Sequence, residues 1–486
     1  MTNPAAPLAS PKSACLPQLY ELSRALREGA LSCVDLAAAC LARIRDDDGR
    51  LGAFVEVYAD GALAAAEQAD RLLRAGTWLG PLHGMPVAVK DAIEVEGRPT
   101  TFGLSARSGR RASRSAAVVE RLQAAGAIIL GKTHLVQFAL GAWGANEQMG
   151  TPRNPWDERT HRVPGGSSSG SAVAVAAGMA PLALGTDTGG SVRVPAAFCG
   201  ITGFKPEACG IDRRGVLPLS RTLDSVGLFA RSAIDAAAAY DAVRADAGRA
   251  LPQLAQARDL QGVRLGRLGE ADLQGVAGPV REAYEAALEA MRRDGARIVA
   301  AAWPGGFAEA ADVTSTIMLA EGAAEHGRLA ADAGQPIDEP VRRRLLAGAR
   351  IPATAYIDAL RARERWQATY RAAAAAAFDA VVTPATPATA VALDGADHLD
   401  PPIRFTRMLN LLDVCGIALP CGFDDQGLPI GIQIAAGSGG ADLLLAIAHR
   451  YQALTDWHLR LPPDGAAPAS PYPSPGATGR PWTPFP

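Results

Sequence analysis

The sequence predicts an α/β protein in which a mixed or mostly parallel sheet is surrounded by alanine-rich helices. Short runs of Val, Ile and Leu alternate along the chain with longer stretches of helical period, which is typical of that class. Hydrophobic residues make up 48% of the 486 positions and charged residues 20%, as in ordinary packed domains. Gly (51) and Pro (35) are frequent without a triplet period, which excludes a collagen-like chain.

The first 170 residues predict three helices, three strands and one long loop. A capping box at Ser32–Asp35 precedes an apolar-periodic run to Ile44, so a helix begins there. Further helices are expected at 60–74 and 115–125, and strands at 53–58, 85–90 and 127–130. Residues 141–170 are rich in Gly, Pro, Asn and Ser and lack any period, which is typical of a functional loop.

The rest of the chain predicts short elements followed by long helices. We expect helices at 172–178, from 194, and at 278–293, 307–334 and 353–379, with strands at 182–185, 381–383 and 430–434. Residues 1–460 are interpreted as a single domain in which the helical region at about 270–375 resembles a lid. Residues 461–486 hold nine of the 35 prolines and are interpreted as an extended or disordered tail.

Charge and cysteine content limit the partners and the compartment. A net charge of −2 disfavours binding to nucleic acid or to a membrane surface. The first 15 residues lack the apolar core of a secretory signal, and the longest apolar run, at 172–184, is too short to span a bilayer. The seven cysteines form no C-x-x-C pair or zinc spacing. We therefore expect a cytoplasmic monomer or homodimer without a metal site.

Two glycine-rich motifs match known patterns without the context that their chemistry requires. Residues 126–133 match the phosphate loop G-x-x-x-x-G-K-T, but the intervening residues are apolar and predict a strand, so Lys132 is interpreted as structural. Residues 166–170 match the nucleophile elbow G-x-S-x-G centred on Ser168, but no strand precedes them. The histidines that could complete a hydrolase triad lie in no distinctive surroundings: His326, His398 and His449.

A third glycine-rich segment, at 185–195, leads from a predicted strand through Gly189 and Gly190 to Ser191. Successive glycines can present backbone N–H groups to a negative oxygen, and a serine at their end could attack a carbonyl. The alternative is a tight turn with a solvent-exposed serine. The residues alone leave both interpretations open.

A nucleophilic serine needs a base, and Lys90 is the candidate. Only four of the 48 basic residues are lysines, and Lys90 ends the apolar strand at 85–90. Burial lowers the pKa of a lysine, so that its amine can accept a proton, which arginine cannot do. The alternative is an ion pair with Asp91. Alternation along a strand weakens this alternative because adjacent side chains point to opposite faces.

Together the segments 165–172 and 185–196 resemble the signature of the amidase signature family. Residues 82–91, 203–206 and 427–433 are similar to further motifs of that family, and the resemblance extends over about 16–454. It implies a large mixed β-sheet core with α-helices on both faces. It also implies that no metal or organic cofactor is needed.

The resemblance also assigns roles to residues. It implies a catalytic triad of Lys90, Ser167 and Ser191, with an unusual cis peptide bond next to Ser167. It implies an oxyanion hole built from the backbone N–H groups of Thr188, Gly189, Gly190 and Ser191. Supporting roles fall on Ser168, Asp187 and Arg193. The residues expected to contact the acyl side of a substrate are Phe138, Gly141, Ala142 and Trp143, which favour an uncharged or aromatic group unless Phe138 and Trp143 belong to the core.

The function implied is a serine amidohydrolase that cleaves a small aryl or alkyl amide, or a carbamate, through an acyl-enzyme on Ser191. One alternative within the family is the A-type subunit of the glutamyl-tRNA amidotransferase, which typically has Gln where this chain has Val194. A second alternative is a catalytically silent scaffold. The intact triad residues argue against a scaffold.

Overall fold

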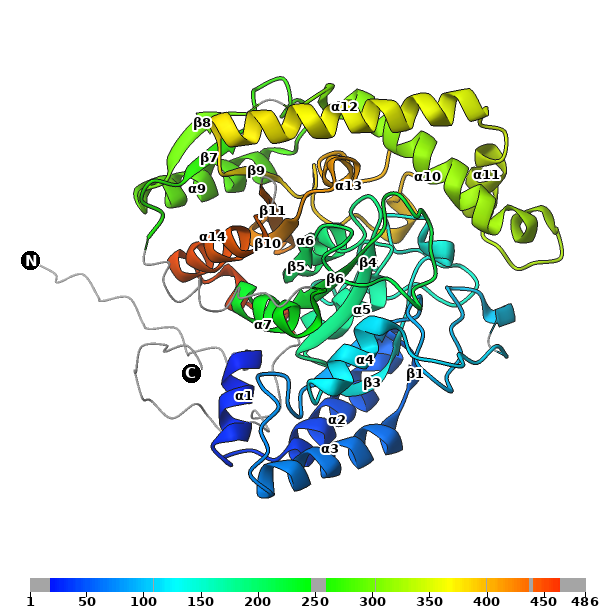
Figure 1. Cartoon of the computed structure of the whole chain (residues 1–486), viewed down its shortest axis with the longest axis vertical. Helices are drawn as coiled ribbons and strands as arrows, with labels where there is room; N and C mark the ends of the chain where they lie inside the picture. Colours follow the sequence, from blue (N-terminus) through cyan, green and yellow to red (C-terminus); the bar gives the residue numbers. More distant parts are fainter. Residues whose placement is uncertain are drawn as a thin grey trace, which may run out of the picture.

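The computed structural model describes residues 18–107, 109–245, 259–301, 303–398, 400–436 and 440–463. An eleven-stranded sheet runs through the molecule in the order β1-β3-β2-β4-β6-β5-β10-β11-β9-β7-β8 (Figure 1). The pairs β2–β3, β2–β4, β7–β8 and β7–β9 are parallel and the other pairs are antiparallel. The prediction of an α/β fold with a large mixed sheet is therefore confirmed.

The strands are short and most are buried on both faces. In chain order they are β1 (Phe54–Val57), β2 (Pro86–Lys90), β3 (Ile128–Thr133), β4 (Leu182–Asp187), β5 (Thr202–Lys205), β6 (Ser225–Ala230), β7 (Arg264–Arg267), β8 (Arg297–Ala300), β9 (Ala380–Pro384), β10 (Gly416–Phe423) and β11 (Pro429–Ala436). Burial on both faces explains why the central strands are continuous apolar runs without polar alternation.

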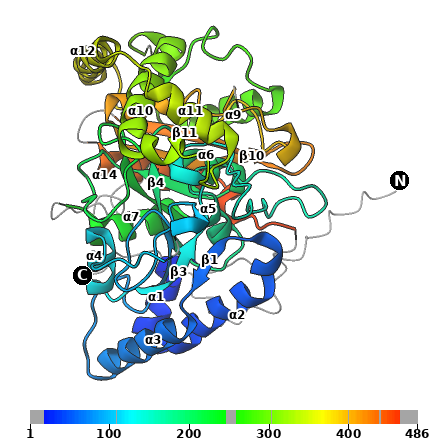
Figure 2. The same cartoon turned by 90° about the vertical axis from the view of Figure 1, so that its right-hand side faces the viewer.

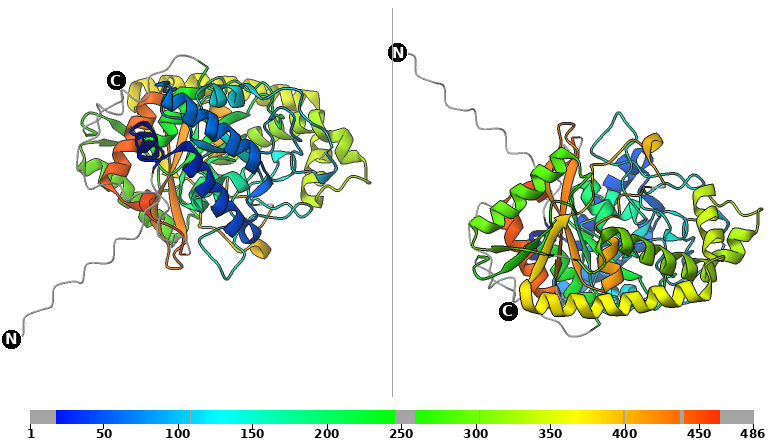
Figure 3. Two further views of the ribbon diagram at one scale, coloured as in Figure 1. Left: turned by 90° about the horizontal axis from the view of Figure 1, so that it is seen from below. Right: turned by 90° about the horizontal axis from the view of Figure 1, so that it is seen from above.

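Helices cover both faces of the sheet (Figure 3). Their bounds are α1 (Leu19–Arg27), α2 (Cys33–Leu51), α3 (Ala59–Arg74), α4 (Ala117–Ala124), α5 (Ser169–Ala176), α6 (Arg193–Cys199), α7 (Ala233–Val243), α9 (Gly278–Arg293), α10 (Gly306–Ala331), α11 (Glu339–Gly348), α12 (Ala353–Ala377), α13 (Arg407–Leu412) and α14 (Ala441–Leu454). Helices α5 and α6 contact each other and the central strands, whereas α7, α14 and α9 form a second packed row. Among the helices described, none is long and apolar enough to cross a membrane.

Helix α2 begins where the capping box predicts and ends later than expected. The Ser32 hydroxyl accepts the N–H of Asp35 at 2.9 Å, as a helix N-cap does. The helix continues beyond Ile44 to Leu51 through charged residues, with an Arg43–Asp47 pair four residues apart at 3.3 Å. It stops at Gly52, whose φ of 64° is left-handed.

Helix α5 brings the serine-rich segment against the sheet because it contains only small residues and valine. All eight of its residues are buried. A Cβ on Gly170 would lie 2.2 Å from the carbonyl oxygen of Ala53 and 2.5 Å from the amide nitrogen of His134. Position 170 therefore requires glycine. This close approach places the serines before α5 near the ends of β3 and β4.

The helical region at about 270–375 contains two kinds of element. Helix α9 packs against β9, β10 and β11 and belongs to the layer on the sheet, whereas α10 packs against α11 and α12. Figures 1 and 2 place α12 at the opposite end of the molecule from α2 and α3. The expected tail at 461–486 falls mostly on 464–486, which lie outside the described residues.

Candidate active site

Lys90 is the last residue of β2 and is fully buried. Its Nζ donates to Ser167 Oγ at 2.8 Å and to Thr186 Oγ1 at 2.7 Å. Burial lowers the pKa of Lys90 to about 7, although the negative charges of Asp224 and Asp187 oppose this shift. An amine with this pKa is partly unprotonated at neutral pH and can accept a proton from a serine.

Asp91, the next residue, points away from Lys90 and pairs with Lys132. Lys132 Nζ lies 2.5 Å from Asp91 Oδ1 and also donates to Thr100 Oγ1 at 3.1 Å. The alternative of a Lys90–Asp91 ion pair is therefore wrong, because alternation along the strand places the two side chains on opposite faces. The phosphate-loop motif ends inside β3, where Lys132 is 1% exposed, so its lysine cannot reach a nucleotide.

Ser167 follows the one cis peptide bond among the described residues, Gly166–Ser167. The segment is packed tightly: Gly166 N–H donates to Ala142 O at 2.7 Å, and Val136 N–H donates to Ser167 O at 3.2 Å. Ser168 directly precedes α5, and no strand lies directly before it, unlike the serine of a nucleophile elbow. Its hydroxyl donates to Thr186 O at 3.1 Å, and its N–H donates to Ser191 O at 3.3 Å, so Ser168 links the two serine loops.

Ser191 lies in the turn between β4 and α6 and is 9% exposed. The carboxylate of Asp187 shapes this turn by accepting the N–H groups of Gly190 at 2.8 Å and Val192 at 3.0 Å. The N–H of Gly190, which has a φ of 136°, is thus already used. For the N–H groups of Thr188, Gly189 and Ser191 there is no acceptor in the part of the chain that the structure describes. Such free donors can bind a developing oxyanion.

The side chain of Thr188 anchors the turn that carries Ser191 to Asp224. Its Oγ1 donates to Asp224 Oδ1 at 2.6 Å, and Asp224 Oδ2 accepts the N–H groups of Leu219 and Ser220. Asp224 is 7% exposed, and burial raises the pKa of its carboxyl to about 6. No motif in the sequence pointed to Asp224, although it belongs to a polar segment that follows the signature.

Arg193 locks Asp187 in place from the first turn of α6. Its guanidinium donates to both carboxylate oxygens of Asp187, at 2.8 and 3.0 Å. Further donations reach Thr406 O at 2.7 Å, Gln433 Oε1 at 2.6 Å and Asn410 Oδ1 at 2.6 Å. Burial alone would raise the pKa of Asp187, but Arg193 holds it well below its usual range. The turn that carries Ser191 is therefore held by a fully buried ion pair between Arg193 and Asp187.

The four expected substrate contacts separate into two pairs. Gly141 and Trp143 line a pocket, whereas Phe138 and Ala142 do not. Phe138 is fully buried and stacks on His326 with 4.8 Å between ring centres, so the alternative of a core residue holds for it. Ala142 uses its carbonyl to hold Gly166. Trp143 is also anchored, because its Nε1 donates to Asp397 O at 2.8 Å.

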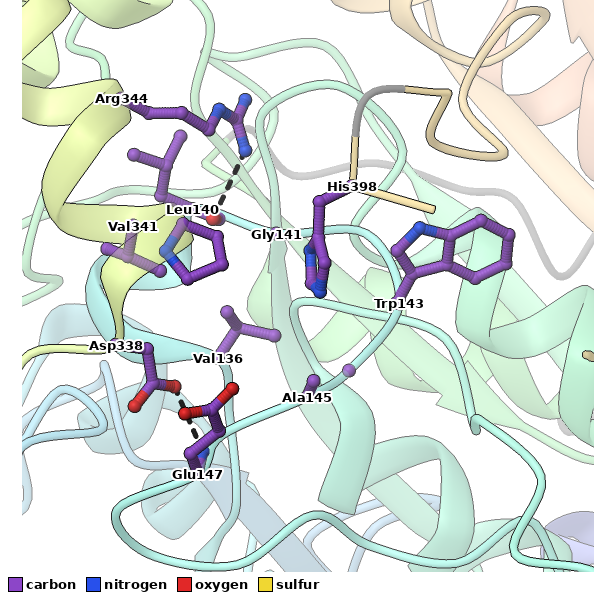
Figure 4. Close-up of a pocket in the computed structure, with 12 residues that line it drawn as sticks. Val136, Leu140, Gly141, Trp143, Ala145, Glu147, Asp338, Val341, Arg344 and His398 are labelled. Carbon is purple, nitrogen blue, oxygen red and sulfur yellow. Dashed lines mark hydrogen bonds between the residues drawn. The ribbon is translucent and has the colours of Figure 1, made fainter. Parts of the chain in front are cut away.

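The same pocket carries charged groups that no sequence pattern had assigned to it (Figure 4). Asp338 lies in the segment before α11 and Arg344 in α11, and Glu147 lies beside Asp338, to which its N–H donates at 2.9 Å. Burial lowers the pKa of Arg344 to about 10. Asp338 Oδ1 is buried without a hydrogen-bond partner. His398 also lines this pocket. Among all the described residues, no cluster of three or more His, Cys, Asp or Glu side chains could hold a metal ion.

Comparisons with known proteins agree with this geometry. The Amidase family model matches residues 35–445. The A-type subunit of a glutamyl-tRNA(Gln) amidotransferase from Azoarcus sp. (strain BH72) is 37% identical, over 91% of this chain and 98% of the relative.

Two solved structures are also similar over most of their length. A structure of a vestigial protein complex that reveals the evolutionary origins of an s-triazine catabolic enzyme superposes with a TM-score of 0.83 at 30% identity, covering 90% of this chain and 98% of that one. The native peptide amidase from Stenotrophomonas maltophilia superposes with a TM-score of 0.77 at 30% identity, covering 92% and 98%. The chain therefore belongs to the amidase family and is a hydrolase of carbon–nitrogen bonds other than peptide bonds.

Proposed function

We propose that the chain is a serine amidohydrolase that forms an acyl-enzyme on Ser191. One observation carries the proposal: Lys90 is fully buried, has a pKa of about 7, and donates to Ser167 without a carboxylate partner in the described residues. A buried amine of this kind is suited to proton transfer and poorly suited to structural ion pairing.

The proposed acylation begins when the unprotonated amine of Lys90 accepts a proton from Ser167. Ser167 then takes the proton of Ser191, whose Oγ attacks the substrate carbonyl carbon. The resulting oxyanion lies against the N–H groups of Thr188, Gly189 and Ser191, and each well-placed donor contributes about 3–4 kcal/mol. The tetrahedral intermediate collapses, the carbon–nitrogen bond breaks, and Ser167 returns a proton to the leaving nitrogen.

Deacylation follows the same path in reverse. Water loses a proton to the Ser167–Lys90 pair and attacks the ester carbonyl, which releases the acid and restores the Ser191 hydroxyl. A carbamate carries one more oxygen beside its carbonyl and would meet the same nucleophile and donors. Primary, aryl and alkyl amides and carbamates are therefore all candidate substrates. The free cysteines among the described residues support the cytoplasm as the compartment.

A second candidate function is the glutaminase step of an amidotransferase. The 37% identical relative carries that name, and the pocket beside Trp143 offers Arg344 for a carboxylate and the unpartnered Asp338 Oδ1 for an ammonium group. A free amino acid carries both groups, so these side chains favour a zwitterion over the uncharged group expected from Phe138 and Trp143. Val194, which follows the signature arginine, favours the stand-alone hydrolase.

The test is covalent labelling of the purified chain with a fluorophosphonate, followed by peptide mapping. Label is expected on Ser191, and Ser191→Ala is expected to lose both labelling and all measurable amide hydrolysis. The matched control is Ser23→Ala, which removes a buried serine of α1 outside the site and should still be labelled at Ser191. Absence of label on Ser191 in the folded wild-type chain would support the silent scaffold. Glutamine as the one substrate turned over would favour the glutaminase.

A further inference from the structure

A second cleft, of about 410 Å³, opens beside the catalytic lysine. Its inner end is formed by Thr186, Asp224 and Ser225, which are 2–7% exposed. Its outer part carries three arginines from the loop between β5 and β6: Arg213, Arg214 and Arg221. A cleft with a buried polar end and a cationic outer part can admit a small ligand and attract an anion.

The arginines differ in how far their charge is already compensated. Arg214 lies 2.5 Å from Glu120 and Arg221 lies 2.6 Å from Glu325, so both have carboxylate partners. Arg213 has no carboxylate partner among the described residues. Its Nη1 donates to Arg221 O at 2.9 Å and to Asp224 O at 2.8 Å. Two backbone carbonyls thus hold this guanidinium in place and leave its remaining N–H groups for a ligand.

The one carboxylate that lines the cleft, Asp224, lies near enough for the charge of Arg213 to lower its pKa, but its oxygens are bonded to other groups. Asp224 accepts the Thr188 hydroxyl and two backbone N–H groups, and it forms no ion pair with Arg213. The guanidinium of Arg213 therefore stays at a fixed position with N–H groups that can still bind a ligand. A carboxylate is the natural partner, because a guanidinium can donate two parallel hydrogen bonds to it.

The inner end of the cleft reaches the proton path. Thr186 Oγ1 accepts a hydrogen bond from Lys90, which in turn donates to Ser167. Ser167, which protonates the leaving nitrogen under the proposed function, and Thr186 thus bond to the same amine, so the inner end of the cleft lies close to the leaving side of the scissile bond. The pocket beside Trp143 is left for the acyl side.

We propose that this cleft binds a carboxylate carried by the leaving amine, so that the preferred substrates are N-acyl amino acids or N-acyl aminobenzoates. This inference rests on the proposed function. In acylation the Ser191 Oγ–carbon bond forms, the carbon–nitrogen bond breaks, and Ser167 supplies the proton that completes the amine. The aminocarboxylate leaves through the cleft, and water then hydrolyses the acyl-enzyme.

The experiment compares 4-acetamidobenzoate with acetanilide, which share an acyl group and differ by one carboxylate on the leaving amine. The wild-type chain is expected to show a kcat/KM at least tenfold higher for 4-acetamidobenzoate, mainly through KM. Arg213→Gln should reduce this ratio to about one, and Arg213→Lys should retain part of it. The matched control is Arg111→Gln, since Arg111 also donates to a carbonyl, that of Gly97, but does not line the cleft. The control should keep the full ratio.

A second readout does not depend on turnover. The product 4-aminobenzoate should slow fluorophosphonate labelling of Ser191 in the wild-type chain at concentrations where aniline does not, and Arg213→Gln should abolish this protection. Equal protection by the two amines, or a ratio near one in the wild-type chain, would overturn the cleft assignment while leaving the hydrolase intact. Loss of labelling itself would instead overturn the proposed function.

Discussion

Two buried lysines on neighbouring parallel strands have opposite surroundings. Lys90 ends β2 and Lys132 lies in β3, and the two are 0% and 1% exposed. Lys132 has a carboxylate partner, Asp91, at 2.5 Å, whereas Lys90 bonds to two hydroxyls. The comparison teaches that burial alone does not decide the role of a lysine: the presence of an adjacent carboxylate decides whether the charge is kept.

The electrostatics follow from these partners. Burial lowers the pKa of both amines, and the adjacent carboxylate of Asp91 opposes the shift at Lys132. Two carboxylates, Asp187 and Asp224, influence the pKa of Lys90 without bonding to it. Asp187 accepts hydrogen bonds from Arg193, and Asp224 accepts one from Thr188. Lys132 is therefore suited to holding charge and Lys90 to exchanging a proton.

The largest expected effect is the loss of activity in Lys90→Arg. Arginine keeps the positive charge but does not release a proton, so kcat should fall about 10²–10⁴-fold, nearly as far as in Lys90→Ala. Steady-state kinetics on an amide that the wild-type chain hydrolyses would measure it. Recovery of more than a tenth of the wild-type kcat by arginine would contradict the base role.

Stability should respond in the opposite sense at the two lysines. Lys132→Met leaves the Asp91 carboxylate buried and unpaired, and should cost about 3–5 kcal/mol of unfolding free energy. Lys90→Met removes an amine that burial disfavours, so the variant should be as stable as the wild-type chain or more stable.

Urea unfolding would measure both variants. Because the pKa of Lys90 is about 7 when folded and 10.5 when unfolded, the unfolded state binds more protons between these values. The gain in unfolding free energy of Lys90→Met over the wild-type chain should then be greatest below pH 7 and shrink towards pH 10. Equal losses of unfolding free energy in Lys90→Met and Lys132→Met would contradict the different roles assigned to the two lysines.

The smallest expected effect is the pH dependence of the wild-type chain. The reactive amine must be unprotonated, so kcat/KM should fall about tenfold per pH unit once the pH drops below about 7. A pH–rate profile for an uncharged amide would measure it, with circular dichroism as a check that the chain stays folded. A profile that is flat down to pH 5 would exclude Lys90 as the titrating group.

Much of the fold could be predicted because its signals are local. The capping box at Ser32, the apolar runs of the central strands and the alternation that separates Lys90 from Asp91 depend on neighbours in sequence. The resemblance also pointed to Lys90, Ser167 and Ser191, which the structure places around one site. Lys90 bonds to Ser167, and the next residue, Ser168, donates its N–H to Ser191 O. Their catalytic roles remain predictions.

The rest depends on partners that are distant in sequence. The residues that hold Arg193 come from α13, its flanking residue Thr406, and β11, more than 200 positions away. Arg344 and Trp143 line one pocket because α11 packs near the loop at 136–147, where Arg344 donates to Leu140 O at 3.3 Å. Phe138 was expected at the substrate, but its φ of 54° belongs to a turn that directs the ring into the core. Local patterns do not encode such contacts.

The support of the Ser191 turn has a consequence for the synthesis of the chain. Ser191 and Lys90, the proposed nucleophile and base, are made early, but Arg193 finds its acceptors other than Asp187 at Thr406, Asn410 and Gln433. Until those residues leave the ribosome, a guanidinium that belongs in the core lacks three of its five hydrogen bonds. The growing chain therefore carries all three proposed catalytic residues for most of its elongation and assembles the support for the Ser191 turn only near completion.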